Sequence, residues 1–326
     1  MMSFQHVTVL LNEAVTMLDC APGKIIVDCT LGGAGHSLAI VKKIVPGGVL
    51  VGIDQDMDAI QNAGRVLGDY AGNVRLVHDN FANLPSILQR LGIHSADGIL
   101  VDLGLSLHQI KDSGRGFSFA GDQPLDMRMN RDTTVTAASI VNQADSDALE
   151  RIFREYGEER WAKRIARRIV EERRKEAIVT TGRLVDIIEN AVPRASAAKS
   201  RIHPATRVFM ALRIAVNREL EVLERFLDTA IDVLAPGGRI CIISFHSLED
   251  RMVKNRFRSL SEVCRCPKTL PVCICTHKPK LRLVSRKPIR PSGEEVASNP
   301  MSRSAVMRVA EKLPDTGSGG APGTSG

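Results

Sequence analysis

The sequence is poor in aromatic residues and contains no long apolar run. Aromatic side chains make up only 4% of its 326 residues, with one tryptophan and two tyrosines. Binding by extensive stacking on successive bases is therefore disfavoured. No apolar run approaches the roughly 20 residues that a membrane-spanning helix needs, so we expect no membrane segment. The opening stretch MMSFQHVTVLLNEAV lacks the basic and then apolar pattern of a secretion signal, so we predict a cytoplasmic protein.

Cysteine is too sparse for a fold held together by disulfides. Seven cysteines in a chain of this length do not make the dense framework of small secreted domains. Three of them stand in apolar contexts and are expected to be buried: Cys20, Cys29 and Cys241. The other four form two C-x-C pairs in the segment CRCPKTLPVCIC: Cys264, Cys266, Cys273 and Cys275. These pairs suit either one tetrahedral Zn²⁺ or reduced thiols in a basic loop.

The charge balance is moderately basic. A net charge of +7 and a pI of about 9.2 suggest a polyanionic partner. Arg194–Arg218 has six basic residues and no acidic one, and Arg251–Arg290 has twelve basic residues against one acidic. Arg151–Glu176, with ten basic and six acidic residues, is instead typical of an ion-paired helical surface. We therefore expect phosphate contacts from the first two stretches.

Short β-branched runs alternate with helical patterns over the first hundred residues. The runs are KIIVDCT, GVLVGID, NVRLVHD and ADGILVDL, and the helical patterns between them are HSLAIVKKIV, MDAIQNAGRVLGD and LPSILQRLG. This order predicts a parallel, doubly wound α/β sheet. Because the strands are apolar almost throughout, we expect helices on both faces of the sheet.

The alternation stops after the fourth strand. From Ser106 to about Asn217 the sequence shows only helical patterns, and the strongest, ALERIFREYGEERWAKRIARRIVEERRKE, is expected to break at Gly157. The runs GGRICIISFHS and SAVMRVAEK then resume the earlier strand pattern.

This organisation predicts four parts. Residues 1–109 form the first part of the α/β core, 110–216 form an inserted helical domain for substrate recognition, and 217–312 form the second part of the core with a basic, cysteine-containing loop. Residues 313–326 are rich in glycine, serine and proline and are expected to be disordered.

A turn of small residues follows the first strand. Gly32, Gly33 and Gly35 let a ligand approach the backbone, and the next helix offers its N-terminal amides. Asp54 ends the second strand, nineteen residues after Gly35, where a carboxylate can accept both hydroxyl protons of a ribose. Counted from Gly33, the sixth position is Leu38, so the turn departs from the dinucleotide fingerprint. The pattern favours S-adenosylmethionine over a nicotinamide dinucleotide.

Several blocks along the chain resemble one protein family. They include DCTLGGAGHS, GIDQD, GILVDLGLS, PLDMRM, HPATRVFMALRIAVNREL and ISFHSLEDR, and the resemblance runs from about residue 6 to residue 312. The chain is similar to the RsmH (MraW) family. The resemblance implies a class I, Rossmann-like, S-adenosylmethionine-dependent methyltransferase sheet with an inserted helical domain. It also implies methylation of the exocyclic N4 of a cytidine in the decoding region of 16S rRNA, within the small ribosomal subunit.

The same resemblance implies which residues contact the cofactor. They are Ala34, Gly35 and His36 in the turn, Asp54 on the ribose, Phe81 near the adenine, Asp102 and Gln109. Phe81 is equally explained as a core aromatic that opens a loop. One segment departs from the family pattern. Residues 102–109 read DLGLSLHQ in this chain, whereas many family members read DLGVSSPQ, so Leu107 and His108 stand where those members have a small residue and a proline.

The predicted reaction needs an acceptor for the amine protons of cytosine. Asp102, at the end of the fourth strand, is our candidate for that catalytic role, and the alternative is that it only binds the methionine end of the cofactor. His246, after the fifth strand, either lines the base pocket and assists proton removal or is a hydrogen-bonded structural group. The sulfonium is already a charged leaving group, so the predicted site contains no metal.

Arg115, Phe117 and Phe119 lie in a glycine-rich loop after the fourth strand. They could hold an extruded base by stacking, or they could pack the loop onto its surroundings. With few aromatic residues in the chain, a structured ribosomal target read by shape and charge fits better than extensive stacking.

Two other functions compete with this prediction. A nicotinamide-dependent oxidoreductase would use the same sheet edge, but it fits the glycine pattern less well. A non-catalytic RNA-binding or assembly factor would keep the fold without the chemistry, and the intact Gly35, Asp54 and Asp102 argue against it. The sequence leaves the oligomeric state open, including a homodimer.

Overall fold

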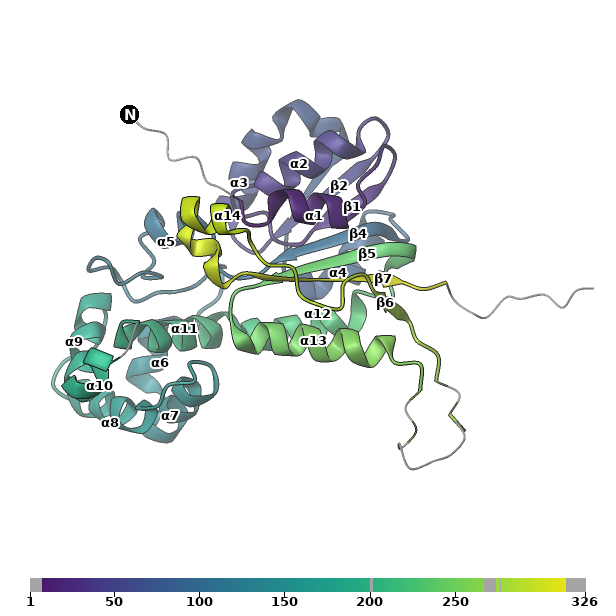
Figure 1. Cartoon of the computed structure of the whole chain (residues 1–326). Coiled ribbons are helices and arrows are strands. Elements are labelled where there is room, and N and C mark those ends of the chain that lie inside the picture. The colour runs from purple at the N-terminus through teal and green to yellow at the C-terminus, as the bar shows by residue number, and fades with distance from the viewer. Residues whose placement is uncertain (1–7, 200–201, 265, 267–273, 276, 315–326) are drawn as a thin grey trace, which may run out of the picture. The chain divides into compact units, whose positions relative to one another are not determined.

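The computed structural model describes residues 8–199, 202–264, 266, 274–275 and 277–314. Within them the chain forms two compact units (Figure 1). The first unit comprises Met1–Asp54, Asp58–Gly104 and Leu223–Gly326, and the second comprises Gln55–Met57 and Leu105–Val222. The predicted inserted segment, 110–216, lies within the second unit. The predicted disordered tail lies outside the described residues from position 315 onward.

The first unit is built on one seven-stranded sheet with the order β3-β2-β1-β4-β5-β7-β6. The strands are β1 (Ile25–Asp28), β2 (Val49–Asp54), β3 (Val74–His78), β4 (Ala96–Asp102), β5 (Leu234–Ser244), β6 (Leu281–Leu283) and β7 (Val306–Lys312). The first five strands pair in parallel, as the alternating sequence pattern predicts. The fold class is therefore the predicted Rossmann-like α/β sheet.

The last strand runs in the opposite direction to the first five strands. β7 lies between β5 and β6 and is antiparallel to both. The chain between β6 and β7 turns back at the edge of the sheet through α14 (Gly293–Ser298) instead of crossing a face with a helix (Figure 1). A return without a crossover brings the strand back in the opposite direction.

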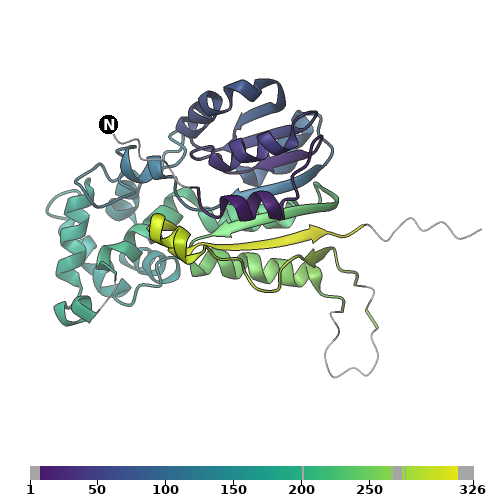
Figure 2. The same cartoon turned by 45° about the horizontal axis from the view of Figure 1, so that its top comes forward.

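Helices cover both faces of this sheet, as the apolar strands predict. α1 (Leu11–Met17), α2 (Gly35–Ile44) and α3 (Met57–Val66) lie on one side, and α4 (Leu84–Arg90), α12 (Glu219–Thr229) and α13 (Ser247–Ser261) lie on the other (Figures 1 and 2). Each face has its own core. Ile40 and Leu50 are buried on the first face, and Ile87, Phe226 and Phe257 on the second. The described part of the unit also contains 3₁₀ segments at Gly68–Asn73, which is kinked at Tyr70, at Phe81–Asn83 and at Pro300–Ser304.

The second unit is helical. Its helices are α5 (Leu107–Lys111), α6 (Ala137–Gln143), α7 (Ser146–Glu155), α8 (Ala162–Glu172), α9 (Thr181–Ala191), α10 (Arg194–Lys199) and α11 (Pro204–Asn217). Phe153, Ile165 and Ile169 are fully buried in its core, in agreement with their helical spacing in the sequence. None of the helices in the described part of either unit is long and apolar enough to span a membrane.

The predicted break at Gly157 is confirmed, because α7 ends at Glu155 and α8 begins at Ala162. A Cβ atom at position 157 would lie 2.7 Å from the carbonyl oxygen of Arg207 and 2.8 Å from that of Phe153. Both contacts are with backbone, which cannot rotate away. The glycine therefore lets the turn between α7 and α8 approach α11 closely.

We expect Gly157→Ala to destabilise the second unit by about 1–3 kcal/mol, the usual cost of forcing extra atoms into a packed site. Gly121→Ala is the matched control, because a Cβ atom there meets nothing within 4 Å. Thermal unfolding followed by circular dichroism measures both variants. Equal midpoints for the two would show that the backbone around Gly157 relaxes without cost.

Candidate functional site

Three aspartates end neighbouring strands at one edge of the sheet. Asp28, Asp54 and Asp102 are the last residues of β1, β2 and β4. The carboxyl ends of parallel strands share one edge, and ligands of open α/β sheets bind beyond it. β1 pairs with both β2 and β4, with Asp28 opposite Gly52 and Leu100, so the three side chains lie within two residues of the same level. The sequence predicted this gathering for Asp54 and Asp102.

The glycine turn connects β1 to α2 at this edge. Gly32 and Ala34 adopt left-handed backbone conformations, with φ of 46° and 63°. The Gly32 amide donates a hydrogen bond of 3.1 Å to Asp54 Oδ2, which ties the turn to the end of β2. Ala34 is the N-cap of α2 and provides no side-chain hydrogen bond to the helix amides. The first turn of α2 therefore keeps backbone donors for a ligand.

Gly35, the first residue of α2, is held in a very tight place. A Cβ atom there would lie 1.9 Å from Thr8 Oγ1 and 3.1 Å from Thr8 Cβ. The N-terminal segment therefore passes directly over the turn, and only a residue without a side chain fits beside Thr8.

Asp28 is a buried carboxyl that the sequence analysis did not select. Its Oδ2 accepts a 2.6 Å hydrogen bond from the Ser37 hydroxyl, and its Oδ1 accepts one of 3.2 Å from the Thr30 amide. Burial raises the pKa of Asp28 to about 7, and the nearby carboxyl of Asp54 acts in the same direction. The signal was present, since Asp28 ends its strand as Asp54 and Asp102 end theirs.

Asp102 combines a fixed backbone with an unsatisfied side-chain oxygen. Its amide donates to Thr30 Oγ1 at 2.7 Å, and its Oδ2 lies 3.7 Å from His36 Nδ1. The side chain is 24% exposed as a whole, but Oδ1 is buried and has no hydrogen-bond partner among the described residues. Burial raises the pKa of Asp102 well above its usual value, and the carboxyls of Asp28 and Glu249 add to this. A buried acceptor without a donor is costly unless a ligand supplies the donor.

Phe81 opens a 3₁₀ turn after β3. Its ring meets Phe226 edge to face, with centroids 5.3 Å apart, and packs against the core beneath α4 and α12. The core interpretation of Phe81 is thus observed, while its contact with adenine stays a prediction. The neighbouring Asp79 accepts hydrogen bonds from Asn83 and Arg90.

His246 follows β5 at the same edge and is the N-cap of α13. Its Nε2 lies 3.0 Å from Oε1 of Glu249, whose other oxygen accepts a 3.0 Å hydrogen bond from the Phe245 amide. Glu249 is buried, and sequence reasoning missed it although it lies only three residues after His246. Both ring nitrogens of His246 are buried and have no hydrogen-bond partner among the described residues, so the contact with Glu249 is one of proximity.

Gln109, the last of the predicted cofactor contacts, belongs to the second unit. Its Oε1 accepts from the Ser106 amide at 3.0 Å in a capping box of α5, and its Nε2 donates to Asp56 Oδ2 at 2.8 Å. Asp56 also binds Arg115 at 2.5 Å, and all three side chains are buried. Both polar ends of the Gln109 amide are therefore engaged within the unit, and its cofactor contact stays a prediction.

The predicted base-holding loop is packed into the second unit. The Arg115 guanidinium also donates to the carbonyl oxygens of Arg128 and Met129 at 3.0 Å each. Phe117 is buried, and Phe119 packs edge to face on Phe209 at 5.1 Å. These contacts agree with the packing interpretation of Arg115, Phe117 and Phe119.

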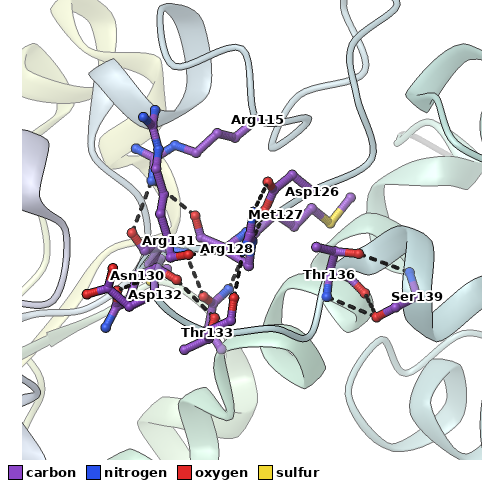
Figure 3. A network of polar contacts seen from close by, with 12 residues as sticks. Arg115, Asp126, Met127, Arg128, Asn130, Arg131, Asp132, Thr133, Thr136 and Ser139 are labelled. Carbon is purple, nitrogen blue, oxygen red and sulfur yellow. Dashed lines mark hydrogen bonds and ion pairs between the residues drawn. The ribbon is translucent and has the colours of Figure 1, made fainter.

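Arg128 is the centre of a network of hydrogen bonds that joins Asp126 to the residues Arg131 and Thr133 (Figure 3). It forms two 2.8 Å hydrogen bonds to Asp126 and two further ones to the carbonyl oxygens of Arg131 and Thr133 (Figure 3). Burial tends to raise the pKa of Asp126, but the bonds from Arg128 outweigh it and hold this pKa below its usual value. The PLDMRM block therefore combines a hydrogen-bonded polar side, formed by Asp126 and Arg128, with three side chains buried in the core of the unit: Leu125, Met127 and Met129.

The positive charge of the two basic stretches, Arg194–Arg218 and Arg251–Arg290, is partly neutralised by acidic residues that lie outside them in the sequence. Arg213 and Arg218 pair with Glu219 and Glu221, just beyond the first stretch. Within the second stretch, ion pairs join Arg256 to Asp228, Lys280 to Asp232 and Arg282 to Glu311. The sequence count therefore overstated the uncompensated charge, because the acidic partners come from other elements.

The carboxyl edge of this Rossmann-like sheet carries a small-residue turn, Asp54 and the unsatisfied buried carboxyl of Asp102, an arrangement typical of enzymes that bind a nucleoside cofactor. A sequence model of the MraW methylase family matches residues 3–313. The chain belongs to the MraW methylase family, which confirms the predicted class, an S-adenosylmethionine-dependent methyltransferase.

Curated relatives cover almost the whole chain. The ribosomal RNA small subunit methyltransferase H of Desulforapulum autotrophicum is 54% identical over 312 residues, which is 96% of this chain and 100% of the relative. The protein of the same name from Clostridioides difficile is 49% identical over 315 residues, with the same two shares. Among solved structures, an rRNA methylase from Streptococcus thermophilus has a TM-score of 0.37 at 11% identity and covers 93% of each chain.

Asp28 makes the stability of the first unit depend on pH. Its pKa is raised, so the folded state holds the proton more tightly than the unfolded state, and stability falls as the pH rises from about 4 to about 7. We expect Asp28→Asn to remove this loss, which amounts to at most about 4 kcal/mol, and to be more stable than the unsubstituted chain at about pH 8. Urea unfolding at about pH 5 and about pH 8 measures the difference.

Asp79→Asn is the control, because its effect on stability at high pH is expected to be opposite to that of Asp28→Asn. Hydrogen bonds from Asn83 and Arg90 outweigh the burial of Asp79 and lower its pKa, so its contribution is present above the ordinary aspartate pKa and is lost in acid. This variant is expected to lose stability at about pH 8. A pH profile of Asp28→Asn parallel to that of the unsubstituted chain would show that Asp28 is ionised in the folded protein.

Proposed function

We propose that this protein transfers the methyl group of S-adenosylmethionine to the exocyclic N4 of a cytidine in the decoding region of 16S rRNA, in the small ribosomal subunit. Two curated relatives at 54% and 49% identity carry the name ribosomal RNA small subunit methyltransferase H. The observation that carries the chemistry is the buried, unpartnered Oδ1 of Asp102 at the edge where the glycine turn and Asp54 also end.

The residues at this edge suit a nucleoside without phosphates. Asp54 already accepts the Gly32 amide through Oδ2 and has acceptor capacity for ribose hydroxyls. Ala34, Gly35 and His36 bring the first turn of α2 close to the bound molecule, and no cationic side chain for a pyrophosphate is part of this turn. S-adenosylmethionine supplies an electrophilic methyl group on a sulfonium.

The transfer forms an N–C bond to cytosine N4 and breaks the S–C bond, which leaves a neutral thioether. The amine lone pair is delocalised into the ring, so an acceptor that holds an amine hydrogen makes the nitrogen more available. Asp102 takes this role through Oδ1, and holding the amine in line contributes up to roughly 7–11 kcal/mol in ideal cases. The methylated nitrogen then loses a proton to a base at the same edge.

Asp102 and His246 share the handling of that proton. The raised pKa of Asp102 makes its carboxyl a hydrogen-bonding group that takes a proton readily. His246 lies after the neighbouring strand, and its two buried ring nitrogens, which lack partners among the described residues, give it the capacity to take up that proton.

Basic side chains hold the RNA by its phosphates. Although several arginines are paired, Arg194, Arg207, Lys254 and Arg290 are exposed, and the chain has a net charge of +7. Phosphate contacts supply affinity without sequence choice, so binding weakens as salt rises. The site of action is the cytoplasm, where the ribosome is assembled, and a homodimer is not part of the proposal.

Asp54→Ala is expected to weaken the binding of S-adenosylmethionine about 10- to 100-fold, because two charge-assisted hydrogen bonds to the ribose are lost. Isothermal titration calorimetry with the cofactor alone measures the effect. Asp97→Ala is the matched control: Asp97 also accepts a backbone amide, that of Ile25 at 2.8 Å, but from the opposite end of β4. Equal affinities in the two variants would rule out the ribose role, and tighter binding of NAD than of S-adenosylmethionine would favour an oxidoreductase.

Asp102→Ala is expected to slow single-turnover methylation of small subunits by about 100-fold at saturating cofactor, because the acceptor for the amine is lost. Transfer of a labelled methyl group to 16S rRNA, followed by nucleoside mass spectrometry, gives both the rate and the modified atom. An unchanged rate would restrict Asp102 to cofactor binding. Binding of subunits without any transfer by the unsubstituted protein would favour a non-catalytic assembly factor.

A further inference from the structure

The segment between α13 and β6 has two legs, and in their described part we find no apolar core. The Lys280 amide donates a 2.8 Å hydrogen bond to the Leu260 carbonyl, which joins the legs at their base. Farther out, Val263 and Ile274 are 74% and 76% exposed. Hydrophobic burial therefore does not hold the legs together, and short segments of this kind usually need a covalent or metal crosslink.

Three cysteines meet between these legs. Cys264 and Cys266 come from the leg that leaves α13, and Cys275 comes from the leg that leads to β6, and their sulfur atoms all lie within 4.8 Å of one another. Cys264 Sγ and Cys275 Sγ are 3.7 Å apart. A disulfide needs about 2.05 Å between the sulfurs, whereas two thiolates on one tetrahedral Zn²⁺ at about 2.3 Å lie about 3.8 Å apart. The observed spacing is therefore too long for a disulfide and matches that of two thiolates on one metal ion, as it also matches a thiol–thiol hydrogen bond.

The surroundings favour thiolates. The Cys266 amide lies 3.3 Å from Cys264 Sγ and donates to it, an arrangement that orients and stabilises a coordinating sulfur.

From this geometry we propose that Cys264, Cys266 and Cys275 bind one Zn²⁺ that crosslinks the two legs between α13 and β6. These three cysteines are the protein ligands of the proposed site, and a water molecule completes the tetrahedral coordination. Cys273 lies outside the described residues. The ion has a structural role, since the segment loses conformational freedom when its legs are joined. This site is separate from the carboxyl edge of the sheet, and the proposal does not depend on the methyl-transfer reaction.

Metal analysis of the full chain tests the site. The protein, purified under reducing conditions with Zn²⁺ and then dialysed, is expected to retain about one zinc per chain, and Cys264→Ser or Cys275→Ser to retain less than about 0.2. Cys20→Ser is the control and is expected to keep the metal, because Cys20 is half-buried and burial raises its pKa to about 11. Replacement by Co²⁺ should give the absorption of a tetrahedral thiolate centre in the control and not in the two variants.

Retention of zinc by the Cys264 and Cys275 variants, or its absence from the unsubstituted chain and the control alike, would overturn the proposal. A disulfide between Cys264 and Cys275 in protein kept under reducing conditions would overturn it as well. Circular dichroism shows whether each variant is folded. Limited proteolysis gives a second readout, since loss of the crosslink is expected to speed cleavage between α13 and β6 without changing cleavage in the second unit.

Discussion

A buried hydrogen bond between the Ser37 hydroxyl and the Asp28 carboxyl joins the end of β1 to the first turn of α2. The turn that contains Gly32 and Ala34 lies between these two residues, so both of its ends are fixed in the core. Thr30, inside the same turn, binds the backbone of Asp102 and thereby fixes the end of β4 as well. One polar cluster thus sets the relative positions of the turn and of the end of β4, the groups that we propose bind the cofactor. This arrangement has a cost, because burial of the Asp28 carboxyl disfavours its charged form and raises its pKa.

The chain passes from the first unit to the second directly after β2 and shortly after β4, the strands whose carboxyl ends carry Asp54 and Asp102. Asp54 ends β2, and Gln55–Met57 already belong to the second unit. Asp102 ends β4, and only Leu103 and Gly104 separate it from the start of the second unit at Leu105. Within the second unit, Asp56 is bound by Arg115 and Gln109, so the short excursion after β2 is firmly held. Two residues proposed for cofactor binding and catalysis therefore lie directly beside the connections to the helical unit.

Local patterns predicted much of this structure because they reflect local physics. Apolar runs of the right length gave the first five strands, and Gly157 marked the break between α7 and α8. The antiparallel direction of β7 was not predictable in the same way, because it depends on how the chain returns after β6. The ion pairs of Arg256 with Asp228 and of Arg282 with Glu311 join elements far apart in sequence, which charge counts along the chain cannot detect. For the candidate site, strand ends located Asp54 and Asp102, but the burial that distinguishes Asp28 arises only when the sheet is assembled.

The contact between Thr8 and Gly35 has a consequence for how this fold can change over evolution. The hydroxyl of Thr8 occupies the space that any side chain at position 35 would need. A larger residue at position 35 is thus compatible with the fold only where position 8 has become smaller or the leading segment has moved aside. Positions 8 and 35, which α1 and β1 separate along the chain, are therefore linked by packing, and a side chain at position 35 requires a change at position 8.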